Sequence, residues 1–243
     1  MRYKVTFSYD GSNYAGLQSQ INALAIQDII EKALFNIYQK TIKITLASRT
    51  DAGVHALAQV FSYETDIEIL ERKIKEGINA FMPKDIHIIE VKKVKDSFHP
   101  RYDVKEKTYE YLINIGEYNP LLVNRAYQCK YKLDLELLEK TMKIFEGEHD
   151  FGSFNTSSYK EYPNQVRIIK SIKMIKKGDL IRIRIVGTGF LRNMVRIIVG
   201  SLIDVARGKV DPQDIKYMLD NPSKGTRRYN ISPSGLYLIN IKY

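Results

Sequence analysis

Apolar residues alternate with polar ones in several segments of the chain, and in others they recur every three or four positions. Alternation predicts β-strands, and the longer spacing predicts amphipathic helices. By these patterns the first half reads strand, helix, strand, strand, helix, strand, in this order: residues 2–10, 26–37, 41–48, 56–64, 67–81 and 85–94.

The second half begins with a predicted strand at 107–115, and Asp134 is placed to cap the helix that follows. Residues 166–187 predict two strands joined by a turn at Lys177-Gly178-Asp179. A long helix is expected from Phe190 to Gly208, because glycine commonly ends a helix.

The chain then predicts a short helix starting at Asp211-Pro212 and a last strand over 235–243. Both halves share a β–α–β–β rhythm. We therefore expect an α+β fold with two duplicated halves, residues 1–103 and 104–243, that share a central, mainly antiparallel sheet with flanking helices.

Composition narrows the class of protein. The chain has 243 residues, 44% of them hydrophobic, which excludes wholesale disorder. Its one cysteine, Cys129, excludes an internal disulfide and a multi-cysteine zinc site, and the four histidines lack the spacing of zinc ligands. No apolar run approaches the ~18 residues of a membrane helix, and we expect a soluble cytoplasmic protein.

Positive charge is concentrated in the second half. The net charge is 38 − 28 = +10; residues 1–120 hold 16 basic and 16 acidic groups, whereas residues 121–243 hold 22 and 12. Such a surplus is typical of a protein with a polyanionic partner, because neutralising phosphates releases counterions, and equally of a lysine-rich surface that keeps the protein in solution. In the predicted second hairpin, Arg182 and Arg184 share one face. Two interpretations stay open for that face: a platform that binds RNA, or an exposed face whose charged side chains are simply solvated.

The segment Ala47 to Ala56 (ASRTDAGVHA) lies between two predicted strands and consists mostly of small residues, from which Arg49, Asp51 and His55 project. Small side chains allow a large ligand to approach the backbone, and Gly53 permits a positive φ. Most loop aspartates only cap a backbone amide, and that reading stays open for Asp51.

A second unusual position is Arg196, which lies in the apolar run Met194 to Val199 of the long predicted helix. An enclosed guanidinium needs a buried acceptor, and a lone one would cost several kcal/mol. Asp51 is a candidate partner. A bidentate pair would hold that carboxylate ionised and fixed, as a nucleophile or base requires.

Tyr109, in Lys107 to Tyr111 (KTYEY), is the third candidate. On a strand it shares a face with Tyr111 and Ile113, so core packing is one interpretation. The other is an aromatic platform for a nucleobase, which is worth about 1–3 kcal/mol per stacked base.

Taken together, these motifs resemble the tRNA pseudouridine synthase A family over nearly the whole chain. The segments that carry the resemblance are YDGSNYAGLQSQ, SRTDAGVHALAQV, FHPRYD, KTYEYLI, GEHDFGSF, GFLRNMVRIIVGSLIDVARGK and GLYL. The run RTDAGVHA is the most specific of them.

The resemblance implies an enzyme that isomerises uridine to pseudouridine in the anticodon stem-loop of tRNA, as a homodimer that uses no cofactor. It implies that Asp51 is the catalytic aspartate and that Tyr109 stacks on the target uracil. It further implies that Arg196 pairs with the aspartate and that Arg49 lies beside the flipped nucleotide.

Two positions depart from the family pattern. The family usually has Trp where this chain has Leu17, and an Ala-Gly-x-Thr-Ala-Pro run where this chain reads Arg228 to Ser234 (RYNISPS). Neither departure is expected to touch the catalytic residues, although the second puts the choice of uridines in question.

Two rival functions remain. One is a non-catalytic RNA-binding module of the same fold. The other is an N-glycosidic hydrolase with two carboxylates, for which Glu64 or Asp66 would have to lie near Asp51. For the isomerase itself, the carboxylate has three possible roles: attack on C1′ of the ribose, attack on C6 of the ring, or removal of the C2′ proton.

Overall fold

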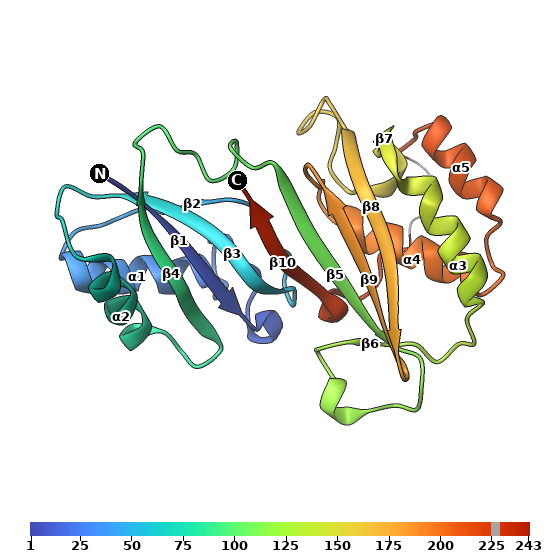
Figure 1. Cartoon of the computed structure of the whole chain (residues 1–243), viewed down its shortest axis with the longest axis horizontal. Coiled ribbons are helices and arrows are strands. Elements are labelled where there is room, and N and C mark those ends of the chain that lie inside the picture. Colours follow the sequence, from blue (N-terminus) through green and yellow to red (C-terminus); the bar gives the residue numbers. More distant parts are fainter. Residues whose placement is uncertain (225–228) are drawn as a thin grey trace. The chain divides into compact units, whose positions relative to one another are not determined.

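The computed structural model describes residues 1–224 and 229–243, which form two compact units (Figure 1). The first comprises residues 1–105 and 237–243, and the second comprises residues 106–236. The last seven residues therefore belong with the first unit, whereas the sequence placed all of 104–243 in the second. Both units combine helices with mainly antiparallel strands, so the expected α+β class is confirmed.

The first unit is built on a sheet with the strand order β4-β1-β3-β10. Its strands are β1 (Arg2–Tyr9), β2 (Thr45–Leu46), β3 (His55–Glu64), β4 (Ile86–Val94) and β10 (Leu236–Lys242), and its helices are α1 (Ile26–Tyr38) and α2 (Glu71–Phe81). One edge of β3 is shared: its first residues pair in parallel with β10, and Phe61 and Ser62 pair with β2.

The alternation of β1 is matched by its burial, with every second side chain inside the core. Val5 and Phe7 are fully buried there, together with Phe61 of β3 and with Ile30 and Ile74 of the two helices. Helices α1 and α2 contact each other, and α2 packs along β4 (Figure 1). The strand and helix patterns predicted from the sequence thus form a single apolar layer.

The strand predicted over 41–48 is an overestimate, because β2 contains only two residues. The backbone N–H of Ile44 donates to the side chain of Glu31 on α1 (3.2 Å) instead of to a neighbouring strand. This side-chain acceptor replaces a ladder hydrogen bond and shortens the strand.

The second unit has the strand order β5-β9-β8-β7, antiparallel throughout, with β6 parallel to β5. Its strands are β5 (Glu106–Asn114), β6 (Tyr127–Gln128), β7 (Gly147–Asp150), β8 (Val166–Lys177) and β9 (Leu180–Gly187), and its helices are α3 (Leu135–Met142), α4 (Met194–Ala206) and α5 (Pro212–Asp220). The predicted turn at Gly178, which has φ +58°, is confirmed.

Helix caps in the second unit follow the sequence closely. The side chains of Asp134 and Asp211 accept backbone N–H groups at the starts of α3 and α5, as predicted. The start of α4 was predicted wrongly: the helix begins at Met194 and not at Phe190, because Asn193 has a left-handed φ of +60° that interrupts the helical path.

Short 3₁₀ helices complete the described fold; they comprise Gly11–Asn13, Pro120–Leu122, Lys143–Phe145, Gly152–Phe154 and Pro233–Gly235. None of the helices in residues 1–224 and 229–243 is long and apolar enough to cross a lipid bilayer.

Candidate active site

The loop of residues 47–54 joins β2 to β3 and carries Arg49 and Asp51. The backbone N–H of Val54 donates to the carbonyl of Asp51 (3.2 Å), and Gly53 has φ +75°, so the chain turns back directly after Asp51. Asp51 is half-buried, whereas Arg49 and Ala52 are exposed. The loop therefore presents a carboxylate beside small residues that leave room for a ligand.

Residues 9–17 support this loop from one side through hydrogen bonds to Thr50, the residue before Asp51. The hydroxyl of Tyr9 lies 2.7 Å from Oγ1 of Thr50, and the backbone N–H of Leu17 donates to the carbonyl of Thr50 (3.3 Å). Thr50 is thus held through both its side chain and its backbone.

Two glycines in the same segment allow the backbones to touch. A Cβ at Gly11 would lie 2.0 Å from the carbonyl oxygen of Val54, and one at Gly16, where φ is +105°, would lie 2.9 Å from that of Thr50. Real Cβ atoms do not approach oxygen this closely, so any other residue would push the loop away.

Leu17 is the position at which the sequence departs from the family pattern. Its side chain is fully buried, and its backbone donates to Thr50, next to Asp51. This contact is with Thr50 and not with a predicted site residue, so it does not contradict the expectation for Leu17. In the other departure, Arg228 lies outside the described residues, while Ile231 accepts a hydrogen bond from Arg196, so the expectation that this departure touches no site residue is wrong.

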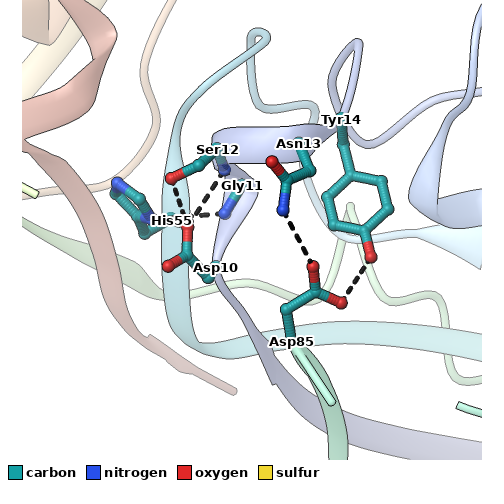
Figure 2. Close-up of polar contacts among 7 residues, drawn as sticks. All are labelled: Asp10, Gly11, Ser12, Asn13, Tyr14, His55 and Asp85. Carbon is teal, nitrogen blue, oxygen red and sulfur yellow. Dashed lines mark hydrogen bonds and ion pairs between the residues drawn. The ribbon is translucent and has the colours of Figure 1, made fainter. Parts of the chain in front are cut away.

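The turn after β1 holds a second group of polar side chains (Figure 2). Oδ1 of Asp10 accepts from the backbone N–H and the hydroxyl of Ser12 (3.0 and 2.5 Å). The same oxygen lies 3.1 Å from Nδ1 of His55. The sequence did not single out Asp10; the Asp-Gly-Ser order is typical of a turn in which aspartate caps its own backbone.

The other side of the turn is held by Asp85, the residue before β4 (Figure 2). Its carboxylate accepts from the hydroxyl of Tyr14 (2.5 Å) and from Nδ2 of Asn13 (3.4 Å). Burial and this hydrogen bond raise the pKa of Tyr14 well above its ordinary range. Tyr14 therefore stays protonated and acts as a permanent donor.

In the second unit, Tyr109 lies on β5 opposite Ile185 of β9 and is only 6% exposed. The ring of Phe190 packs edge-on against it, with 5.1 Å between ring centroids. The ring of Tyr109 is therefore fixed in orientation within a largely apolar environment.

Arg196, on the first turn of α4, is half-buried. Its Nε donates to the carbonyl of Ile231 (2.8 Å), and Nη1 donates to Oδ1 of Asn193 (2.9 Å). The guanidinium thus connects the start of α4 to the segment before β10.

The predicted basic face of the hairpin exists, because Arg182 and Arg184 are exposed while the intervening isoleucines are buried. Arg184, however, forms a salt bridge with Glu110 (2.5 Å), and Lys170 on β8 forms one with Glu106 (2.9 Å). Part of this face is therefore neutralised within the unit.

Comparison with known proteins identifies the family. The family model for tRNA pseudouridine synthase matches residues 5–103 and 141–243. Curated proteins named tRNA pseudouridine synthase A are similar over the full chain: that of Oceanobacillus iheyensis is 39% identical (96% of its length), and that of Exiguobacterium sp. is 40% identical (98% of its length). A third, from Thermosipho melanesiensis, is 38% identical and is covered over 99% of its length.

The chain belongs to the tRNA pseudouridine synthase family. The matched residues include Arg49, Asp51 and Arg196, whereas Tyr109 falls between the two matched segments. The first segment also contains residues 9–17, which hold the loop of Asp51. The family match therefore covers both the loop and its support.

We predict that Gly11→Ala destabilises the first unit by roughly 1–3 kcal/mol, the usual cost of forcing an extra methyl into a packed site. The cause is the 2.0 Å approach of the new Cβ to the carbonyl of Val54. Urea unfolding measures the loss. Gly189→Ala is the control, because its Cβ would meet nothing nearer than 3.8 Å. Equal stability of the two variants would contradict the prediction.

Proposed function

We propose that this protein isomerises uridine to pseudouridine in the anticodon stem-loop of tRNA, with Asp51 as the catalytic group. The observation that carries the proposal is the half-buried carboxylate of Asp51 on a loop of small residues whose backbone is fixed. This loop coincides with the most specific motif shared with the family, RTDAGVHA, which runs from Arg49 to Ala56.

The chemistry requires little beyond one such carboxylate. The bond between ribose C1′ and uracil N1 breaks, the base turns, and a bond forms between C1′ and C5. The proton on C5 leaves, and N1 gains one, so all atoms are conserved and no electrons are gained or lost. An ionised Asp51 is suited to any of three roles: attack on C1′, attack on C6, or removal of the C2′ proton.

The surroundings of the Asp51 carboxylate leave room for a nucleotide that has been extruded from its stack. Extruding a base costs a few kcal/mol, and less in a loop than in a duplex. Ala52 and Gly53 add almost no side chain beside Asp51, so a nucleotide can approach the backbone. Exposed Arg49 has no hydrogen-bond or ion-pair partner among the described residues, and in our proposal it contacts a phosphate of the extruded nucleotide.

Tyr109 and Arg196 complete the proposed site. A tyrosine ring fixed by Phe190 loses little freedom when a uracil stacks on it, and the largely buried environment strengthens polar contacts. We propose that Arg196 pairs with Asp51 and keeps it ionised. Its bonds to Ile231 and Asn193 support this role because they hold the guanidinium in place.

The rival hydrolase is not supported by the geometry of the first unit. Glu64 lies at the opposite end of β3 from His55, about 30 Å away at 3.3 Å per residue, and is paired with Arg2. Asp66 is paired with Lys40 (2.7 Å) just beyond. Paired glycosidase carboxylates are roughly 5–9.5 Å apart, so neither residue can serve as the second acid.

We further propose a homodimer, as the family resemblance implies, that works in the cytoplasm. The basic surplus of residues 121–243 gives each copy a surface suited to one tRNA. Light scattering on the purified protein would report the molar mass, and a monomer at working concentration would contradict the dimer.

We predict that Asp51→Asn folds and binds tRNA but forms no pseudouridine, because the amide cannot act as a nucleophile or base. Release of tritium from tRNA labelled at C5 of uridine measures the reaction directly. Asp85→Asn, the same change in the same unit, is the control and is expected to remain active. Full activity of Asp51→Asn would refute the mechanism, and free uracil as the product would favour the hydrolase.

We predict that Tyr109→Phe keeps most activity, whereas Tyr109→Leu lowers kcat/KM by about 5- to 150-fold, which corresponds to the loss of about 1–3 kcal/mol of stacking. Leucine fills the space without offering a ring face. Steady-state kinetics on a transcribed tRNA would separate the two variants. Equal losses in both would show that the hydroxyl, and not the ring, is what matters.

The two arginines are predicted to differ. Arg49→Gln should leave the melting temperature unchanged and lower the magnitude of the slope of log affinity against log salt by about 0.7, the effect of one phosphate contact to a single strand. Arg196→Gln should cost roughly 1–3 kcal/mol of stability, because it leaves buried acceptors unpaired, and should also lower kcat. Melting curves and salt titrations test both. Unchanged melting and turnover for Arg196→Gln would show a merely solvated arginine.

A further inference from the structure

The loop of Asp51 is anchored on both sides of the aspartate by the same segment, residues 9–17. Before Asp51, Thr50 is held by Tyr9 and Leu17. After Asp51, the contacts converge on His55, the first residue of β3. Between these anchors, Ala52 and Gly53 have no large side chain to pack. The position of Asp51 therefore depends on how well the two anchors are fixed.

His55 is a buried histidine with an unusual set of neighbours. Only 3% of it is exposed, and its ring stacks on that of Tyr237, with 4.6 Å between centroids and 21° between planes. Nδ1 faces two groups of the turn after β1: as the Nδ1–H tautomer it donates to Oδ1 of Asp10 (3.1 Å), and as the other tautomer it accepts the backbone N–H of Gly11 (3.2 Å), so either form ties the ring to this turn (Figure 2). Stacking fixes the plane of the ring, and these contacts fix its rotation within that plane.

Asp10 is itself fixed, because Oδ1 also accepts two hydrogen bonds from Ser12. A carboxylate held by neighbouring donors is a rigid acceptor and not a mobile surface charge. The contact between Asp10 and His55 therefore links the turn after β1 to the start of β3, 45 residues later in the chain.

The pairing of β1 with β3 is irregular at the place where Asp10 contacts His55. Between the pairs Phe7–Gln59 and Tyr9–Ala56, β3 has one more residue than β1, which is a β-bulge. A bulge bends its strand and breaks the hydrogen-bond ladder locally. The β1 ladder thus holds the start of β3 less firmly, and the side-chain contacts of His55 add to its parallel pairing with β10.

We propose that His55 and Asp10 are positioning residues for Asp51: their contact holds the loop in the register from which the carboxylate reaches the target nucleotide. This inference rests on the proposed catalytic role of Asp51. It assigns a function to the YDGS segment, Tyr9 to Ser12, which the reaction itself does not use.

The chain offers a matched control on the same turn. Asp85 is also a carboxylate that fixes the turn, but its side-chain contacts among the described residues are with Asn13 and Tyr14 and none is in the loop. Removing it perturbs the turn without removing the link to His55. A merely structural role for Asp10 predicts the same effect from both substitutions.

The test compares His55→Phe, Asp10→Ala, Asp10→Asn and Asp85→Ala. Phenylalanine retains the stack on Tyr237 but lacks Nδ1, and asparagine retains the oxygen that Ser12 contacts. We expect kcat to fall about 10²-fold in His55→Phe and Asp10→Ala, the cost of a displacement of roughly 1 Å, with KM for tRNA little changed. Asp10→Asn should recover much of the loss, and Asp85→Ala should keep the wild-type kcat even if its melting temperature falls.

Two further results decide the matter. The double variant His55→Phe/Asp10→Ala should be no slower than the slower single variant, because both remove one contact. Wild-type kcat in His55→Phe, or an equal loss of kcat in Asp85→Ala, would overturn the positioning role while leaving Asp51→Asn inactive. An active Asp51→Asn would instead refute the proposed function. If Asp10→Ala does not fold, His55→Phe and Asp10→Asn still give the answer.

Discussion

The first unit depends on the close approach of two backbones, those of residues 9–17 and 47–54. Glycine at positions 11 and 16 allows this approach, since a Cβ at either place would overlap a carbonyl oxygen of the loop. A loop of small residues gains little from side-chain packing, so its rigidity has to come from such contacts. The conformational entropy of Asp51 is then lost on folding and not when the substrate binds, which is the condition for efficient catalysis by a positioned group.

Most of the fold was predictable, because most elements follow a local pattern. The alternation of β1, the spacing of α1 and the capping aspartates of α3 and α5 all act within a few residues, and the structure confirms them. The errors occur where a local pattern is overridden. Glu31 captures the amide of Ile44 and shortens β2, and Asn193 adopts a left-handed conformation that delays α4.

The candidate site was predictable only in part. The loop of Asp51 stood out because small residues and isolated charges fit no strand or helix, and Arg196 stood out as a charge within an apolar run. Asp10 gave no such signal, since its partner His55 lies 45 residues away and an aspartate before Gly-Ser looks like an ordinary turn. Likewise, nothing local indicates that residues 237–243 join the first unit, because parallel pairing with His55 and Ala56 is a long-range contact.

A catalytic carboxylate in an RNA-modifying enzyme faces an electrostatic conflict, because its substrate is a polyanion. Bringing another negative charge to the ribose is unfavourable unless cations offset it. The second half supplies 22 basic groups against 12 acidic ones, yet Glu106 and Glu110 neutralise two of the cations on its hairpin. Exposed Arg49 lies two residues before Asp51 and has no such partner among the described residues. In the proposed site, the cation that offsets this conflict is therefore carried on the same loop as the carboxylate, and the two charges would reach the substrate together.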